Sequence, residues 1–76
     1  MVIGVTMVKV MPGQERTVYN ALKEIEGIKD VYHVFGEYDF VVVLEVEGLS
    51  VLNRLLDTIR EIHNVTATQT VVGAEL

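Results

Sequence analysis

The stretch Phe35–Val46, FGEYDFVVVLEV, places a glycine and two acids directly before a nearly unbroken apolar run. Gly36–Asp39 has the composition of a tight turn, and Phe40–Glu47 is typical of a β-strand. Both alternating sets of residues in the apolar run are hydrophobic, so both faces of the strand need a cover. The stretch therefore predicts a central strand, and it raises the question of what faces Asp39 at its entrance.

The flanking sequence alternates between strand-like and helix-like patterns. β-Branched residues fill Val2–Val10, apolar residues recur at helical spacing in Gln14–Gly27, and Lys29–Phe35 again resembles a strand. Gly27 is predicted to end the first helix and Ser50 to cap a second one. Val65–Val72 is predicted to close the chain as a fourth strand. The order of elements is βαββαβ.

An internal repeat supports this order. Lys23–Gly36 aligns without gaps on Arg60–Gly73, and every matched pair is 37 positions apart. Two similar halves of this kind predict an α+β, ferredoxin-like sandwich, in which a four-stranded antiparallel sheet carries both helices on one face. We expect residues 1–76 to form a single domain.

The two central strands predict self-association. Helices on one side of the sheet leave the other side bare, yet the first strand is apolar on both sides: Val2, Val8 and Val10 share one face, and Ile3, Val5 and Met7 share the other. A surface of this kind exceeds what a monomer usually exposes, so we expect a dimer formed through the open sheet face. The alternative is that β-branched residues simply suit strands and stay partly exposed.

Composition excludes several classes of protein. The 76 residues carry 11 acids and 6 bases, and the bases form no cluster of the kind that binds a phosphate backbone. We therefore expect no direct binding of nucleic acid. The chain has no Cys, and its apolar opening segment carries Lys9 and is too short to span a bilayer. We expect a cytoplasmic protein that does not contact membranes.

Three features of the sequence occur together: the βαββαβ order, the turn G-E-Y-D-F at Gly36–Phe40, and the T-x-T pattern of Thr68 and Thr70. On these features, the chain resembles the effector-binding RAM domain of the Lrp/AsnC family of transcription regulators. Regulators of this family carry an N-terminal helix-turn-helix domain, whereas this sequence begins at the first RAM strand. The resemblance thus implies a stand-alone sensing and assembly module that acts through a partner, such as a full-length regulator of the family.

The resemblance also implies where a ligand binds. Dimers of such domains assemble into rings, and amino-acid effectors bind between dimers near the turn. Carried over by position, the ligand-binding residues are Gly36, Tyr38 and Asp39 of the turn, together with Thr66, Thr68 and Thr70 of the last strand.

The chemistry of these residues suits a zwitterion. Asp39 can accept a charge-assisted hydrogen bond from an ammonium group, and Gly36 allows a positive φ that brings backbone N–H groups to a carboxylate. Threonine hydroxyls can donate or accept, and Tyr38 could form a wall of the pocket. The alternatives are that Asp39 only satisfies its own turn, that the threonines are a solvated strand face, and that Tyr38 is a packing residue.

Two other functions share this topology. An enzyme of the dimeric α+β-barrel type would need catalytic or metal-binding groups, but His33 and His63 have no neighbour at metal-ligand spacing. We therefore predict no catalytic residue, no metal and no cofactor. An ACT-like amino-acid sensor would place its ligand at the first turn, beside Pro12 and Gly13, instead of at the second hairpin.

Overall fold

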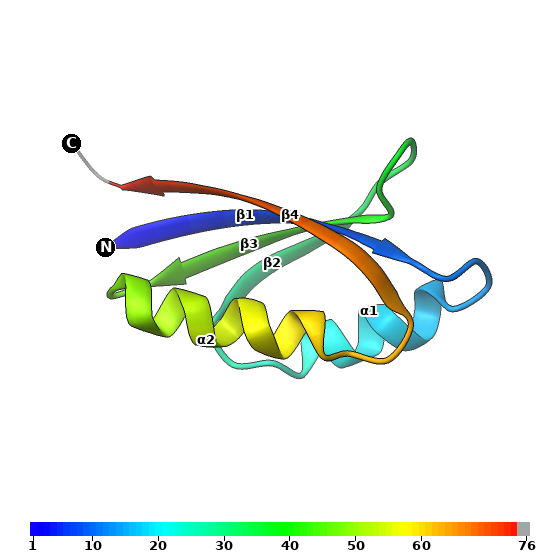
Figure 1. Ribbon diagram of the computed structural model, residues 1–76, viewed down its shortest axis with the longest axis horizontal. Coiled ribbons are helices and arrows are strands. Elements are labelled where there is room, and N and C mark those ends of the chain that lie inside the picture. Colours follow the sequence, from blue (N-terminus) through cyan, green and yellow to red (C-terminus); the bar gives the residue numbers. More distant parts are fainter. Residues whose placement is uncertain (75–76) are drawn as a thin grey trace.

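The computed structural model describes residues 1–74 and confirms the predicted fold (Figure 1). The elements are β1 (Val2–Val10), α1 (Glu15–Lys23), β2 (Ile28–His33), β3 (Phe40–Val46), α2 (Leu49–Arg60) and β4 (Val65–Ala74). The strands form one antiparallel sheet in the order β2-β3-β1-β4. Both helices lie on the same side of this sheet, and the β2–β3 hairpin projects away from them (Figure 1). Residues 75 and 76 of the expected domain lie outside the described residues.

The core lies between the sheet and the helices. Along β3, Phe40, Val42, Leu44 and Val46 are buried, because the even-numbered residues of this strand face the helix layer. The helices contribute Val18, Leu22, Leu52, Leu56 and Ile59. Gly4 of β1 allows the closest approach, since a Cβ at this position would come within 2.7 Å of Cδ1 of Leu52.

The other side of the sheet, which we call the open face, carries a continuous apolar surface. Directly paired residues of antiparallel strands share a face, and Val5 pairs with both Val43 and Val71, while Met7 pairs with Val41. All five of these positions are partly or fully exposed, and Val71 is 60% exposed. Within residues 1–74, both helices lie on the opposite side of the sheet, so no helix covers these positions.

The internal repeat is visible in the backbone. Helix α1 ends at Lys23 and α2 ends at Arg60, while β2 begins at Ile28 and β4 begins at Val65. The connecting turns each contain one residue with a positive φ, which is Gly27 (97°) in the first half and Asn64 (77°) in the second. The two halves therefore use the same helix-to-strand connection at matched positions.

Three local predictions are wrong. Ser50 does not cap α2, because the helix starts at Leu49 and Ser50 already lies inside it; the N-cap is Gly48, which makes no side-chain bond. Gly27 does not cap α1, which ends at Lys23, and serves the turn before β2 instead. Strand β2 ends at His33, two residues before the predicted end at Phe35, because the chain already enters the hairpin there.

Candidate functional site

The β2–β3 hairpin presents the turn residues that the sequence singles out. Gly36 has a φ of 124°, as predicted, and a side chain at this position would meet no atom within 4 Å. Phe35, just before it, is 92% exposed, which is unusual for so large an apolar side chain. The bond from Val34 N–H to the Asp39 carbonyl closes the hairpin at its base. The turn is thus a fixed loop that projects beyond the sheet.

Asp39 is tied to β1 by both its backbone and its side chain. Its amide donates to the carbonyl of Val8 at 2.9 Å, and its carboxylate oxygen Oδ2 accepts the amide of Val10 at 2.8 Å. Regular pairing between β1 and β3 stops at Val8 and Phe40, so the carboxylate provides the next partner along β1. One oxygen of Asp39 therefore has a structural role, but toward β1 and not within its own turn, as the sequence-based alternative had it.

Tyr38 extends from the hairpin toward the opposite edge of the sheet. Its hydroxyl donates to Oε1 of Gln69 on β4 at 2.9 Å. Gln69 pairs with Met7, which places this contact on the open face. Sequence reasoning missed Gln69, although strand alternation already separates it from the threonines on either side of it.

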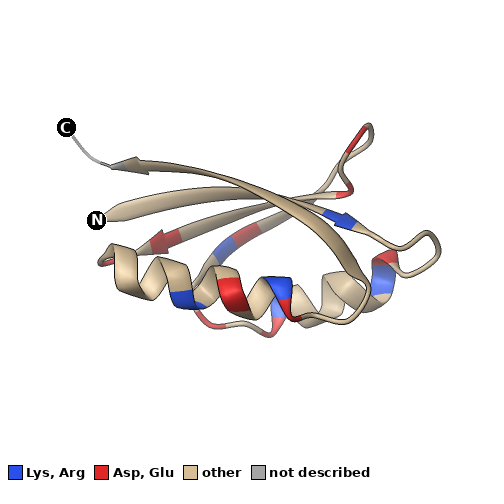
Figure 2. Cartoon of the chain, in the orientation of Figure 1, with Lys and Arg blue, Asp and Glu red and all other residues tan. Residues whose placement is uncertain are grey.

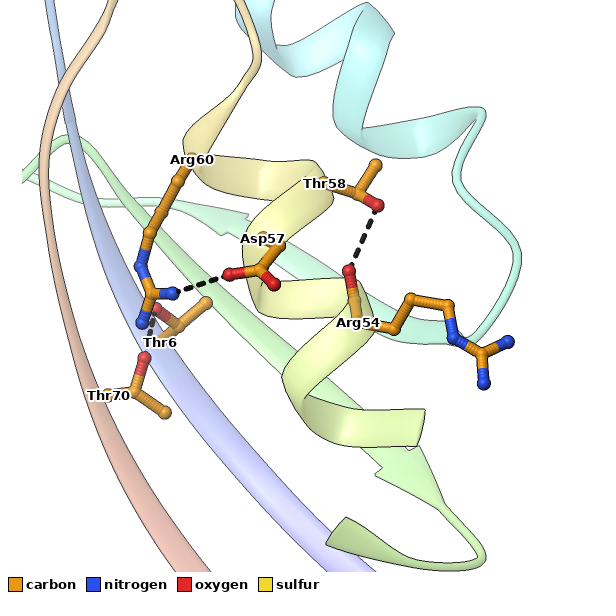
Figure 3. A network of polar contacts seen from close by, with 6 residues as sticks. All are labelled: Thr6, Arg54, Asp57, Thr58, Arg60 and Thr70. Carbon is orange, nitrogen blue, oxygen red and sulfur yellow. Dashed lines mark hydrogen bonds and ion pairs between the residues drawn. The ribbon is translucent and has the colours of Figure 1, made fainter. Parts of the chain in front are cut away.

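The three threonines of β4 do not gather around Asp39 within one chain. Thr68 pairs with Val8 and Thr70 with Thr6, and both of these β1 residues are fully buried on the helix side. The hydroxyl of Thr70 lies 2.9 Å from that of Thr6 (Figure 3). Thr66 is exposed at the point where the β1–β4 register shifts, and it donates to the carbonyl of Lys9 at 3.2 Å. The predicted site residues of one chain are thus separated by the sheet. Tyr38 contacts Gln69 on the open face, whereas Thr68 and Thr70 lie on the helix side.

Charge is distributed over the molecule, with Lys and Arg dispersed over β1, β2, α1 and α2 (Figure 2). The ion pair between Lys29 and Glu45, at 2.8 Å, links β2 and β3. The hydrogen bond to Glu45 and its negative charge raise the pKa of Lys29 above its ordinary value. Within residues 1–74, no three His, Asp or Glu side chains are grouped as metal ligands, and no helix has the length and apolar character needed to cross a membrane.

A family model described as the Lrp/AsnC ligand binding domain matches residues 2–74. The chain belongs to this family. The helices, the sheet order and the hairpin described above are therefore those of an Lrp/AsnC ligand-binding domain, which is a regulatory domain of transcription regulators.

Individual relatives agree with this assignment. The HTH-type transcriptional regulator FL11 of Pyrococcus abyssi is 35% identical over 66 residues, which cover 87% of this chain and 44% of that protein. The chain thus spans less than half the length of this relative. The crystal structure of FFRP-DM1 is 29% identical, covers 97% of this chain and 100% of its own, and superimposes with a TM-score of 0.90.

One match concerns an enzyme. Homocitrate synthase of Sulfolobus acidocaldarius is 35% identical over 46 residues, which cover 60% of this chain and 10% of the enzyme. This match is confined to a small part of a much longer protein, whereas the other matched relatives named as regulators share more of their length. The relatives of the Lrp/AsnC domain are thus mostly transcriptional regulators.

Proposed function

We propose that this Lrp/AsnC domain senses a small amino acid at the β2–β3 hairpin and modulates transcription by associating with partner regulators of its family. The amino acid binds at the seam where neighbouring dimers meet, and the dimers close into a ring. The protein acts in the cytoplasm, does not bind nucleic acid directly and catalyses no reaction. The proposal that a domain of this size acts by itself is supported by the structure of FFRP-DM1, whose whole chain matches this domain.

The fixed orientation of the Asp39 carboxylate is the observation that carries the proposal. Oδ2 accepts the Val10 amide, and no hydrogen bond from the described residues reaches Oδ1. Because the first bond fixes the carboxylate, Oδ1 is a preorganised acceptor for a ligand ammonium group. In this arrangement, backbone N–H groups beside Gly36 receive the ligand carboxylate.

The remaining predicted residues complete the site from β4. Tyr38, held by Gln69, forms one wall. Thr66, Thr68 and Thr70 provide hydroxyls along an edge strand, which a neighbouring copy can approach. Since the Tyr38 contact lies on the open face and Thr68 and Thr70 lie on the helix side, a ligand reaches both sets only across a seam between copies.

Self-association follows from the open face. Central positions such as Val5, Met7, Val41 and Val43 remain partly exposed in one chain. Burying this surface against a second copy removes apolar area from water, at a gain of roughly 25 cal/mol per Å². A dimer formed this way is the unit from which the ring is built.

A thermal-shift screen of the twenty amino acids tests the proposal. A ligand present at about 100 times its dissociation constant stabilises a protein by about 2.7 kcal/mol, which raises its melting temperature measurably. We expect one amino acid, or a few that are chemically related, to stabilise the wild-type protein. If all twenty leave the melting temperature unchanged at millimolar concentration, the sensing role is wrong.

A further inference from the structure

A second concave site lies on the far side of the sheet from the open face, between α1 and the edge strand β2. It has a volume of about 640 Å³, which is within the usual range for sites that enclose a small molecule. Its lining residues come from the first turn and α1 (Gly13, Glu15, Arg16, Tyr19), from β2 (Val31, Tyr32, His33) and from the start of β3 (Phe40). These residues come from four neighbouring segments of the same fold, which the α1–β2 packing brings together.

Aromatic rings form a continuous row along the cleft. The ring centroids of Tyr19 and Phe40 are 6.0 Å apart, those of Phe40 and His33 are 5.1 Å apart, and those of His33 and Phe35 are 5.3 Å apart. Phe40 is buried, whereas His33 and Phe35 are exposed, so the row runs from the core to the hairpin tip. A row of this kind offers both stacked and edge contacts to another planar ring.

Two opposite charges flank the aromatic row. Residues three and four positions apart on a helix are neighbours, so Arg16 and Glu15 both lie beside Tyr19. Oε2 of Glu15 accepts the amide of Gly13 at 3.4 Å, which turns this carboxylate toward the cleft wall. The Arg16 guanidinium makes no ion pair with any acid among residues 1–74. The cleft thus combines an anion, an available cation and an aromatic floor.

We propose that the α1–β2 cleft binds a zwitterionic aromatic amino acid. The guanidinium of Arg16 holds the ligand carboxylate, Glu15 accepts from its ammonium group, and the ligand ring packs against Tyr19 and His33, whose rings rest on the buried Phe40. A carboxylate alone would be repelled by Glu15, and an amine alone by Arg16, so the pair of charges selects the zwitterion. This inference does not rest on the hairpin site, which uses different residues and needs a second copy.

The test uses L-phenylalanine as the probe and aromatic NMR signals as the readout. We expect L-phenylalanine to shift the ring signals of Tyr19 and His33. Three analogues lack one group each: 3-phenylpropionate lacks the ammonium, 2-phenylethylamine lacks the carboxylate, and L-alanine lacks the ring. Each should bind weaker by about tenfold or more, the usual loss for one charged hydrogen bond or one buried ring.

Matched variants separate the two sites. Arg16→Gln should weaken L-phenylalanine binding about tenfold or more. Arg54→Gln, on the exposed face of α2, should leave it unchanged (Figure 3 shows Arg54 directed away from the sheet). The inference is overturned if L-phenylalanine does not bind, or if Asp39→Asn abolishes its binding while Arg16→Gln has no effect. The second of these results would leave the proposed function intact.

Discussion

Asp39 and Thr66 bind the two polar ends of a single peptide unit, the one between Lys9 and Val10. Oδ2 of Asp39 accepts the Val10 amide at 2.8 Å from the β3 side, and the Thr66 hydroxyl donates to the Lys9 carbonyl at 3.2 Å from the β4 side. This peptide is also where the β1–β4 register shifts. Two of the predicted ligand-binding residues therefore hold the end of a central strand in place.

Removing the Asp39 carboxylate should destabilise the fold through Val10. This residue is only 4% exposed, so Asp39→Ala leaves a poorly hydrated amide without its partner, at a cost of about 1–3 kcal/mol. Asp39→Asn keeps an acceptor oxygen and should cost less than about 1 kcal/mol. Urea denaturation measures both values. Glu37→Ala in the same turn is the control, and equal stability of Asp39→Ala and this control would contradict the structural role.

The two faces of β3 should respond differently to a charge. Val42 is fully buried under the helices, so Val42→Asp should lower the free energy of unfolding by about 3–5 kcal/mol. Val43 lies on the open face, and Val43→Asp should leave the circular dichroism spectrum unchanged while it breaks the oligomer. Light scattering at micromolar concentration measures the mass. A wild-type monomer, or a Val43→Asp oligomer of wild-type size, would contradict dimerisation through this face.

The repeat predicts unequal tolerance at its two matched turns. Asn64 adopts a positive φ that costs most side chains about 1–2 kcal/mol, so Asn64→Gly should be nearly neutral and Asn64→Val should destabilise by about that amount. The matched substitution in the first half, which replaces Gly27 by Asn, should lower the stability of the fold. A Cβ at Gly27 would lie 2.8 Å from Cδ1 of Leu55, so Gly27→Asn should destabilise although Asn occupies the matched position. Thermal melts of the three variants check this, and a stable Gly27→Asn would contradict the packing of α2.

The pair of Lys29 and Glu45 predicts an alkaline limit to stability. The bond to Glu45 raises the pKa of Lys29 in the folded state above its ordinary value of 10.5. The stabilising contribution is therefore fully present below that value and is lost as the pH rises through the raised pKa. An NMR titration of the lysine Cε signal should show the pKa return toward its ordinary value in Glu45→Gln. The control Glu47→Gln should leave it raised, and an equal pKa in both variants would exclude Glu45 as the cause.

Periodicity in the sequence predicted the elements of this fold, because alternation and helical spacing depend on residues close together in the chain. The strand Val2–Val10, the apolar face of α2 and the repeat at Lys23 and Arg60 are all of this kind. The ends of the helices are harder to predict from sequence. Gly48 and Ser50 are both acceptable N-cap residues, and tertiary packing decides between them.

The site depends on register, which the sequence does not specify by itself. That the Asp39 carboxylate reaches Val10 depends on the pairing of β1 with β3, some thirty residues apart along the chain. The helix-side position of Thr70 depends on its pairing with Thr6. A regular strand would place Thr66 with the other threonines, but the register shift beside Lys9 turns it to the solvent.

The central claim is that Asp39 binds the ammonium group of an amino-acid effector in addition to the Val10 amide. Calorimetric titration of Asp39→Asn with the amino acid that stabilises the wild-type protein tests it most directly, with Glu37→Gln as a control that removes the same charge from the same turn. We predict that Asp39→Asn weakens binding by about 1.5–3 kcal/mol, while its ligand-free melting temperature and its oligomer mass stay close to wild type. Unchanged affinity together with a lowered melting temperature would contradict the claim and leave Asp39 with its structural bond alone.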